Sequence, residues 1–205
     1  MDKASDHSRN TYHVGNLAPL LLAAGRVMLE QVGPAKLSIR AISENVGVSA
    51  TATYHHFANR VDLLSHIAAQ GFKELECALQ ARPNTNSKLD LLKNASLIYF
   101  QFAQKNPALY QLMFGSELSN IEIFELNTAR TSAFNELKKI IAEVLDKEVN
   151  DTEVKQAALS TWTYTHGLAS LVIQNVIDYP SEMSNENFIN RILQGFEYLF
   201  QKLNT

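Results

Sequence analysis

Residues 38–57 read SIRAISENVGVSATATYHHF, and this stretch decides the fold. It contains two short helical segments separated by the sequence Asn-Val-Gly-Val. Gly47 can adopt a positive φ angle, so the chain can turn sharply between the two segments. Val46 and Val48 flank the glycine and can bury the corner. The stretch therefore predicts a helix-turn-helix.

The second of these helices is expected to begin at Ser49. Small and hydroxyl-bearing residues at a helix N-terminus suit the major groove of duplex DNA, which is about 12 Å wide. Serine and threonine hydroxyls can bond base edges or phosphates, and Tyr54 and His55 can reach phosphates. The residues expected to face outward are Ala50, Thr51, Thr53, Tyr54 and His55.

Further helical segments flank this motif. An apolar periodic segment starts after Asn16 and ends at Gly33-Pro34. On the other side, Asn59 caps a longer helix that continues to about residue 81. We therefore expect a three-helix unit with a connecting fourth helix over residues 14–81, preceded by a flexible arm at residues 1–13.

The clearest break in the sequence is Arg82-Pro83-Asn84-Thr85-Asn86, which separates this unit from a second helical block over residues 85–205. No stretch alternates with period two for long enough to be a strand. The predicted fold class is all-α, with about nine helices: an N-terminal helix-turn-helix domain and a C-terminal helical bundle. Apolar spacing of three and four residues predicts the bundle helices at about residues 88–105, 107–115, 119–147, 151–178 and 185–203.

The composition, 205 residues with 46% hydrophobic and 19% charged, fits a folded protein. Its single cysteine, Cys77, excludes an intrachain disulfide framework, and we expect it to lie in the core. The first 60 residues hold 6 Lys and Arg against 4 Asp and Glu, and the remainder holds 12 against 17. The N-terminal part is therefore the better candidate for a polyanionic partner. Without a signal sequence or a long apolar run, we expect a cytoplasmic protein with no membrane partner.

Several short motifs follow one another in a fixed order over nearly sixty residues. They are a first helix ending in Gly33, then Leu37-Ser38-Ile39-Arg40-Ala41-Ile42-Ser43, Gly47-Val48-Ser49, Tyr54-His55-His56-Phe57 and Asn59-Arg60-Val61-Asp62-Leu63-Leu64. With these motifs, residues 15–72 resemble the DNA-binding domain of TetR-type transcriptional regulators. The resemblance implies an all-helical homodimer that binds double-stranded operator DNA and has a variable effector-binding C-terminal domain.

The resemblance also implies roles for individual residues. Ser38 and Arg40 match positions near backbone phosphates, Arg60 matches a basic residue that touches phosphate, and Phe57 matches a core aromatic. The recognition helix has no Lys or Arg, so we do not expect it to read guanine directly. The expected DNA-contacting residues are Ser38, Arg40, Ser49, Ala50, Thr51, Thr53, Tyr54, His55 and Arg60.

The second half contains Trp162-Thr163-Tyr164-Thr165-His166-Gly167, which resembles a Trp…His-Gly element of one TetR subgroup. Trp162 and His166 share a helix face, either beside an effector cavity or in a plain core. Ligand pockets are largely apolar, although aromatic residues at helical spacing also build ordinary cores. The acidic balance of this half mildly favours a cationic or neutral effector. The candidate pocket residues are Tyr99, Phe102, Phe114, Phe124, Phe134, Trp162 and His166.

These observations favour a DNA-binding repressor that a small-molecule effector releases from its operator. We find no Gly-rich phosphate loop, His-Glu-x-x-His or Gly-x-Ser-x-Gly motif. We therefore expect that the protein is not an enzyme and that it has no catalytic residue, metal or cofactor. In this family the last two helices pair across a two-fold axis, so we expect a homodimer through residues 151–178 and 185–203. Two alternatives stay open: a helical binding or scaffold protein that has lost DNA binding, and a helical enzyme acting on an apolar molecule.

Overall fold

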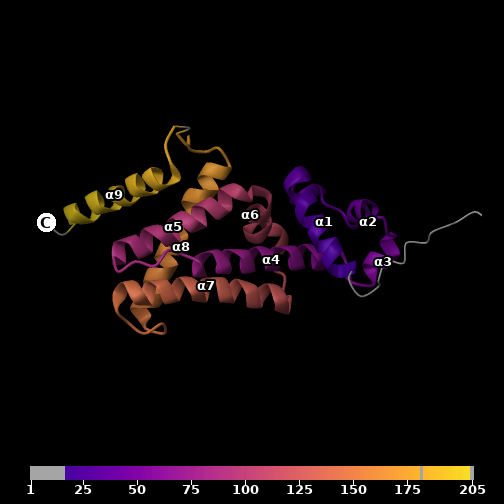
Figure 1. Cartoon of the computed structure of the whole chain (residues 1–205), viewed down its shortest axis with the longest axis horizontal. Helices are drawn as coiled ribbons and strands as arrows, with labels where there is room; N and C mark the ends of the chain where they lie inside the picture. The colour runs from indigo at the N-terminus through magenta and orange to yellow at the C-terminus, as the bar shows by residue number, and fades with distance from the viewer. Residues whose placement is uncertain (1–16, 181, 204–205) are drawn as a thin grey trace, which may run out of the picture.

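The computed structural model describes residues 17–180 and 182–203, so the expected arm at residues 1–13 lies outside the described part of the chain. The described residues form α-helices and two short 3-10 turns, without a strand, and the expected all-α fold is confirmed (Figure 1). None of these helices is both long enough and apolar enough to cross a membrane. The elements are α1 Leu17–Val32, η2 Pro34–Lys36, α2 Ile39–Val46, α3 Ala50–Tyr54, α4 Arg60–Gln80, α5 Lys88–Lys105, α6 Pro107–Phe114, η3 Ser116–Leu118, α7 Phe124–Leu145, α8 Thr152–Ile173 and α9 Asn185–Leu203.

Local capping explains where the helices of the N-terminal head, α1 to α3, begin and end. The side-chain oxygens of Ser38, Ser49 and Asn59 each accept a hydrogen bond from the backbone N–H three residues later, at 3.2, 3.1 and 3.0 Å. These bonds satisfy otherwise unpaired amides at the starts of α2, α3 and α4. Gly47 ends α2 with a φ of 80°, a left-handed conformation that favours glycine. The predicted helix-turn-helix is therefore present.

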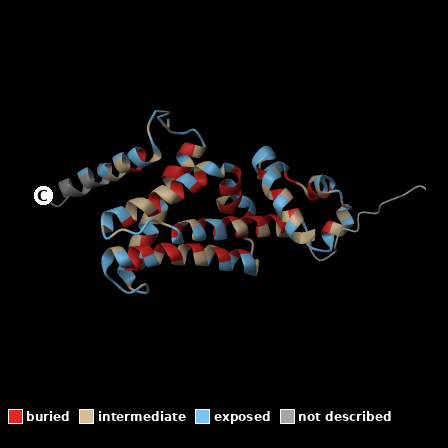
Figure 2. Cartoon of the chain, in the orientation of Figure 1, coloured by how far each residue is buried: buried red, intermediate tan, exposed pale blue. Residues whose placement is uncertain are grey.

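Helix α4 joins the head to the bundle. It packs along α7 for most of its length, while α6 lies between α4 and α1 (Figure 1). A Cβ atom at Gly71 would lie 2.7 Å from the Met113 sulfur and 2.9 Å from a Leu109 methyl, so α4 and α6 approach this closely because residue 71 is glycine. Buried residues follow the faces that these helices turn toward one another (Figure 2).

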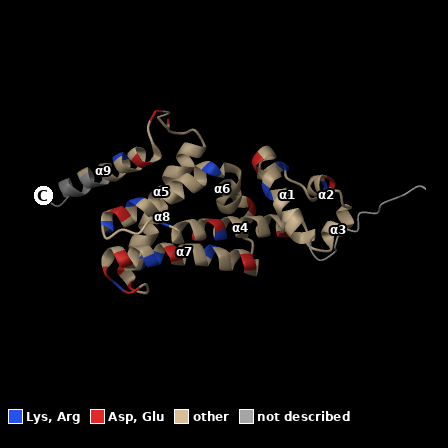
Figure 3. Cartoon of the chain, viewed as in Figure 1, with Lys and Arg blue, Asp and Glu red and all other residues tan. Residues whose placement is uncertain are grey.

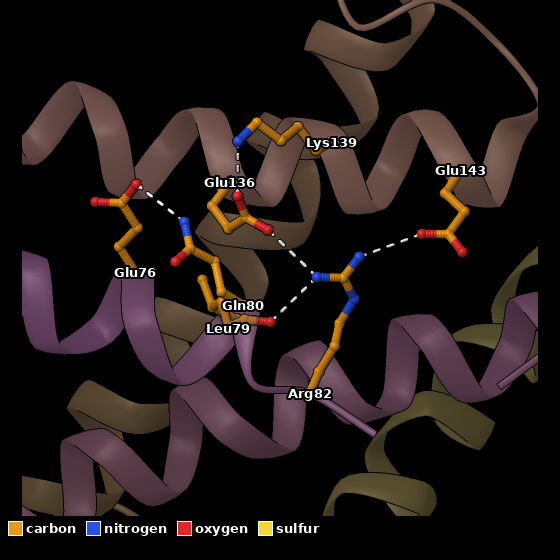
Figure 4. Close-up of polar contacts among 7 residues, drawn as sticks. All are labelled: Glu76, Leu79, Gln80, Arg82, Glu136, Lys139 and Glu143. Carbon is orange, nitrogen blue, oxygen red and sulfur yellow. Dashed lines mark hydrogen bonds and ion pairs between the residues drawn. The ribbon is translucent and has the colours of Figure 1, made fainter. Parts of the chain in front are cut away.

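An ion-pair network fixes the C-terminal end of α4 to α7 (Figure 4). The Arg82 guanidinium donates to the backbone oxygen of Leu79 and to the carboxylates of Glu136 and Glu143, each at 3.2 Å. Glu136 is buried at 4% exposure and also accepts from Lys139 at 2.9 Å. A buried carboxylate needs such partners, because its desolvation would otherwise be costly.

Three sequence-based expectations about the bundle are wrong. Helix α7 begins at Phe124 and not at residue 119, because the preceding chain forms η3 and buries Leu118. Helix α8 ends at Ile173 and not at residue 178, because Asn175 is left-handed with a φ of 53° and the Val176 N–H bonds back to the Leu171 oxygen. Cys77 is exposed and does not lie in the core.

Candidate nucleic-acid interface and effector cavity

A buried hydroxyl pair fixes α3 against α2. The Thr53 Oγ1 and Ser43 Oγ atoms are 2.7 Å apart, and Ser43 also donates to the backbone oxygen of Ile39 at 2.8 Å. Thr53 is fully buried, so the expectation that it faces outward is wrong. The sequence carried a signal for this, because Thr53 lies four residues, about one helical turn, before the expected core residue Phe57, whose N–H bonds to the Thr53 oxygen at 3.0 Å.

The outer face of α3 is open to solvent. Thr51 and His55 are exposed, and the Tyr54 side chain is 54% exposed. Helix α3 carries no charged residue (Figure 3), so this face offers hydroxyl, phenol and imidazole groups and not a positive charge. A neutral, hydroxyl-bearing face of this kind can contact base edges and phosphates in a major groove.

The remaining candidate DNA-contacting residues of the head differ in whether their side chains already have partners within the protein. The Arg40 side chain is 85% exposed and pairs with Glu44 at 3.1 Å, an exposed ion pair of small energetic value that a phosphate can replace. The Ser38 and Ser49 hydroxyls cap their own helices, and Ala50 is half-buried.

Arg60 makes contacts that the sequence did not indicate. Its Nε donates to the Leu37 oxygen at 2.7 Å, and its Nη2 donates to the Pro34 oxygen and lies 3.5 Å from a Glu117 carboxylate oxygen. These bonds tie the connection between α1 and α2 to the start of α4. Arg60 therefore has a structural task within the head, whatever it contributes to phosphate binding.

The second candidate site is an apolar cavity enclosed by α4, α5, α7 and α8, with Phe114 of α6 at its wall. It has about 30 Å³ of free space, room for roughly two water molecules. Small-molecule sites usually offer about 300–1,000 Å³, so the walls must move to admit a ligand of ordinary size. The lining residues are Phe72, Leu75, Leu79, Ala95, Ser96, Tyr99, Phe114, Arg130, Ala133, Phe134, Leu137, Thr161, Trp162 and Thr165.

Four of the seven candidate pocket residues, Tyr99, Phe114, Phe134 and Trp162, line this cavity. The expectation for Phe124 is wrong, because its side chain is 79% exposed at the first turn of α7. The expectation for Phe102 is also wrong, because Phe102 lines a separate surface groove between α4 and α5. His166 lies behind Tyr99 and does not line the cavity.

Four ring side chains, those of Tyr99, Tyr110, Trp162 and His166, connect the cavity to α6 through hydrogen bonds. His166 Nδ1 is 3.1 Å from the Tyr99 hydroxyl and 2.6 Å from the Tyr110 hydroxyl, and Trp162 Nε1 donates to the Tyr99 hydroxyl at 3.3 Å. Burial raises the pKa of Tyr99 and of Tyr110, so both phenols keep their protons near neutral pH. Burial lowers the pKa of His166, which favours a neutral ring that accepts through Nδ1.

Comparison with known proteins identifies the two halves separately. Residues 21–67 match the family model described as bacterial regulatory proteins, tetR family, and residues 92–194 match the model described as tetracyclin repressor-like, C-terminal domain. The chain belongs to the TetR family. It is a DNA-binding transcriptional regulator and not an enzyme, as the sequence predicted.

Among curated proteins, this TetR-family chain is similar to nucleoid occlusion factor SlmA. It is 24% identical to SlmA of Marinomonas sp. (strain MWYL1) over 140 residues, which are 66% of this chain and 67% of that protein. It is 27% identical to SlmA of Aliivibrio fischeri (strain MJ11) over 103 residues, 48% of this chain and 51% of that protein. The chain therefore aligns with about half the length of the Aliivibrio relative.

Solved structures share the fold. A protein of unknown function from Rhodococcus sp. RHA1 superposes with a TM-score of 0.74 at 24% identity, covering 91% of this chain and 96% of that one. A tetR-family regulatory protein from Rhodococcus RHA1 gives 0.62 at 18% identity, covering 90% and 95%. A TetR variant from Acinetobacter baumannii AYE, in complex with minocycline, gives 0.59 at 19% identity, covering 87% and 95%.

The polar residues of the cavity wall were not among the residues predicted from the sequence; they are Ser96, Arg130, Thr161 and Thr165. Arg130 lies four residues before Phe134, so helical spacing places both on one face of α7. That spacing could have indicated a cation beside the aromatic residues. Ser96 lies three residues before Tyr99, so the same spacing places it on the face of α5 that carries a predicted pocket residue.

The lowered pKa of His166 predicts a pH-dependent stability. Its neutral form is favoured in the folded state, so its stabilising contribution is fully present above the ordinary pKa of 6.5 and is lost as the pH falls through the lowered folded value. Urea unfolding at pH 7.5, 6.5 and 5.5 should show a smaller loss of stability on acidification for His166→Gln than for the wild type. His56→Gln, which changes an exposed histidine, should keep the wild-type dependence. Equal slopes for wild type and His166→Gln would contradict the assignment.

Proposed function

We propose that this TetR-family regulator is a ligand-responsive repressor whose two protomers bind adjacent major grooves, in the cytoplasm where the DNA lies. One observation carries the proposal: α4 belongs to both candidate sites. Its first residue, Arg60, holds the α1–α2 connection, and Phe72, Leu75 and Leu79 farther along the same helix line the cavity. A change in the cavity walls therefore acts on an element that positions the DNA-binding head.

The small volume of the cavity supports release by a ligand. Because the cavity holds about 30 Å³ of free space, a ligand of ordinary size can bind only to a conformation with displaced walls. A ligand shifts an equilibrium by its preference for one of two conformations. The conformation with the closed cavity is then the DNA-binding one, and the expanded conformation is the one that leaves the operator.

A second connection between cavity and head passes through α6. The Glu30 carboxylate of α1 accepts from the backbone N–H groups of Ala108 and Leu109 at 2.9 and 3.0 Å, at the start of α6. Tyr110, on the same helix, contacts His166 beside the cavity. Displacement of Tyr99 or Trp162 by a ligand would therefore also act on α1 through α6.

The exposed apolar residues of α8 and α9 support a dimer through these helices. Leu159 is 57% exposed, Leu171 is 42% exposed and Tyr198 is 68% exposed. Helix α9 packs against α5 and then projects away from the other helices, which leaves its far end open to a partner (Figure 1). A two-fold dimer would place two recognition helices about 34–36 Å apart, one turn of the duplex.

Selection of bound duplexes from a random pool tests the dimer and the DNA binding together. The wild type should select two inverted half-sites one helical turn apart. Leu159→Arg/Leu171→Arg should be monomeric by light scattering and should lose the preference for paired half-sites, because two charges would face the proposed interface. Leu89→Arg, at a 49% exposed leucine of α5, should remain dimeric. Selection of an unpaired site by the wild type would contradict the proposed symmetry.

A further inference from the structure

One charged residue, Arg130, lines the cavity. Its Nη2 donates to the backbone oxygen of Leu118 at 2.9 Å, and its Nη1 lies 3.5 Å from the Asn127 side-chain oxygen. The guanidinium carbon is 5.8 Å from the centre of the Phe72 ring, which also lines the cavity. Among the described residues, no carboxylate lies within ion-pairing distance of Arg130.

The protein removes part of this charge from water. Partial burial lowers the pKa of Arg130, which reflects the penalty of holding a cation among apolar side chains. By contrast, the guanidinium of Arg82 elsewhere in the bundle forms ion pairs with two carboxylates, those of Glu136 and Glu143. Arg130 has only neutral oxygens and an aromatic face, so an anion entering the cavity would find an unpaired cation.

Ser96 supplies a second unused polar group. It lies on α5 at 2% exposure, lines the cavity, and its Oγ has no hydrogen-bond partner among the described residues. Buried hydroxyls normally have a partner, and leaving one without costs free energy. A polar atom of a ligand would satisfy it. The rest of the wall is mainly apolar, contributed by leucine, alanine and aromatic side chains.

We propose that the effector is an apolar molecule carrying one anionic group, a carboxylate, which pairs with Arg130 while the apolar body occupies the space between Phe72 and Trp162. This refines the effector site of the proposed function and relies on that function only for the consequence on DNA binding. It replaces the expectation of a cationic or neutral effector. That expectation came from the net charge of residues 61–205, and no acidic residue lines the cavity.

The proposal places the entrance for the ligand at two aromatic residues of the cavity wall. Phe134 of α7 and Trp162 of α8 are half-buried lining residues with ring centres 4.9 Å apart. Arg130 lies one helical turn from Phe134, so an anion that enters between these two rings would come close to the cation. Trp162 is the single tryptophan of the chain, and its fluorescence therefore reports directly on this wall.

The test uses two carboxylates of different shape, decanoate and naphthalene-2-carboxylate, each matched with the corresponding alcohol, and decyltrimethylammonium as a cation. The 205-residue protein is titrated with each compound below its critical micelle concentration, and Trp162 fluorescence and calorimetry measure binding. We expect saturable binding of at least one acid, binding of its alcohol at least about 10-fold weaker, and no saturable binding of the cation.

Arg130→Gln should weaken binding of that acid by about 10- to 100-fold and abolish the preference for acid over alcohol. Arg130→Lys should keep the preference, because the charge remains, and this variant guards against a folding defect in Arg130→Gln. Arg191→Gln, at an exposed arginine of α9, should bind like the wild type. Binding of neither acid, equal binding of acid and alcohol, or an unchanged preference in Arg130→Gln would overturn the proposal.

Measuring duplex binding in the same samples separates the two proposals. If an acid binds through Arg130 and the protein stays on its duplex, the ligand class stands and ligand-responsive release fails. If the duplex binds and neither acid does, DNA binding stands and the ligand class fails.

Discussion

The double variant Thr51→Ala/Tyr54→Ala is expected to bind the duplex selected by the wild type roughly 100-fold more weakly than the wild type does, with an unchanged unfolding temperature. Both residues lie on the exposed face of α3, and neither side chain has a hydrogen bond or ring contact with another described residue, so their removal should not destabilise the head. Each lost contact to a base edge or phosphate costs about 1–2 kcal/mol, and the two together correspond to this factor. Fluorescence anisotropy with a labelled duplex at fixed salt measures the affinity, and circular dichroism measures the unfolding temperature.

A matched control is Phe124→Ala, which removes another exposed aromatic ring at a distance in sequence from the recognition helix. Its affinity for the duplex should equal that of the wild type. If Thr51→Ala/Tyr54→Ala retained full affinity, or if Phe124→Ala lost as much, the recognition face would not be the outer face of α3.

Arg82→Ala should lower the free energy of unfolding by about 3 kcal/mol. The reason lies in Glu136, which is 4% exposed and would lose its partner on the α4 side while retaining Lys139. Urea denaturation followed by circular dichroism measures the change. Because residues of both α4 and α7 line the cavity, the same variant should bind ligands less tightly.

Two further variants test whether the loss of stability comes from leaving a carboxylate buried without its partner or from losing an ion pair as such. Lys88→Ala breaks the exposed pair between Lys88 and Asp146 and should cost less than about 1 kcal/mol. Arg82→Met/Glu136→Leu removes both charges and should be more stable than Arg82→Ala, since no unpaired carboxylate remains buried. A double variant less stable than Arg82→Ala would contradict this explanation.

The sequence predicted the features that depend on neighbouring residues. Ser38, Ser49, Asn59 and Gly47 act within one helical turn, so their roles as caps and turn follow from local chemistry. The same locality explains why the helix-turn-helix and the break after α4 could be located from the order of residues alone.

Features that depend on distant packing were harder to predict. Arg60 bonds to backbone oxygens 23 and 26 residues away, and no local pattern marks such a contact. Phe124 fits an apolar helical pattern but lies at an exposed helix end. The aromatic residues of the cavity could be suspected from their spacing. The polar residues Ser96 and Arg130 share this spacing, but only the packing of α5 and α7 against α4 decides that they line one cavity.

The account depends on the outer face of α3 lying against duplex DNA. A photo-reactive phenylalanine analogue at position 54, compared with the same analogue at position 124, tests this directly on the selected duplex. We predict cross-links to DNA from position 54 at two symmetric sites about one helical turn apart, and none from position 124. A bound duplex that cross-links from position 124, or fails to cross-link from position 54, would contradict the account.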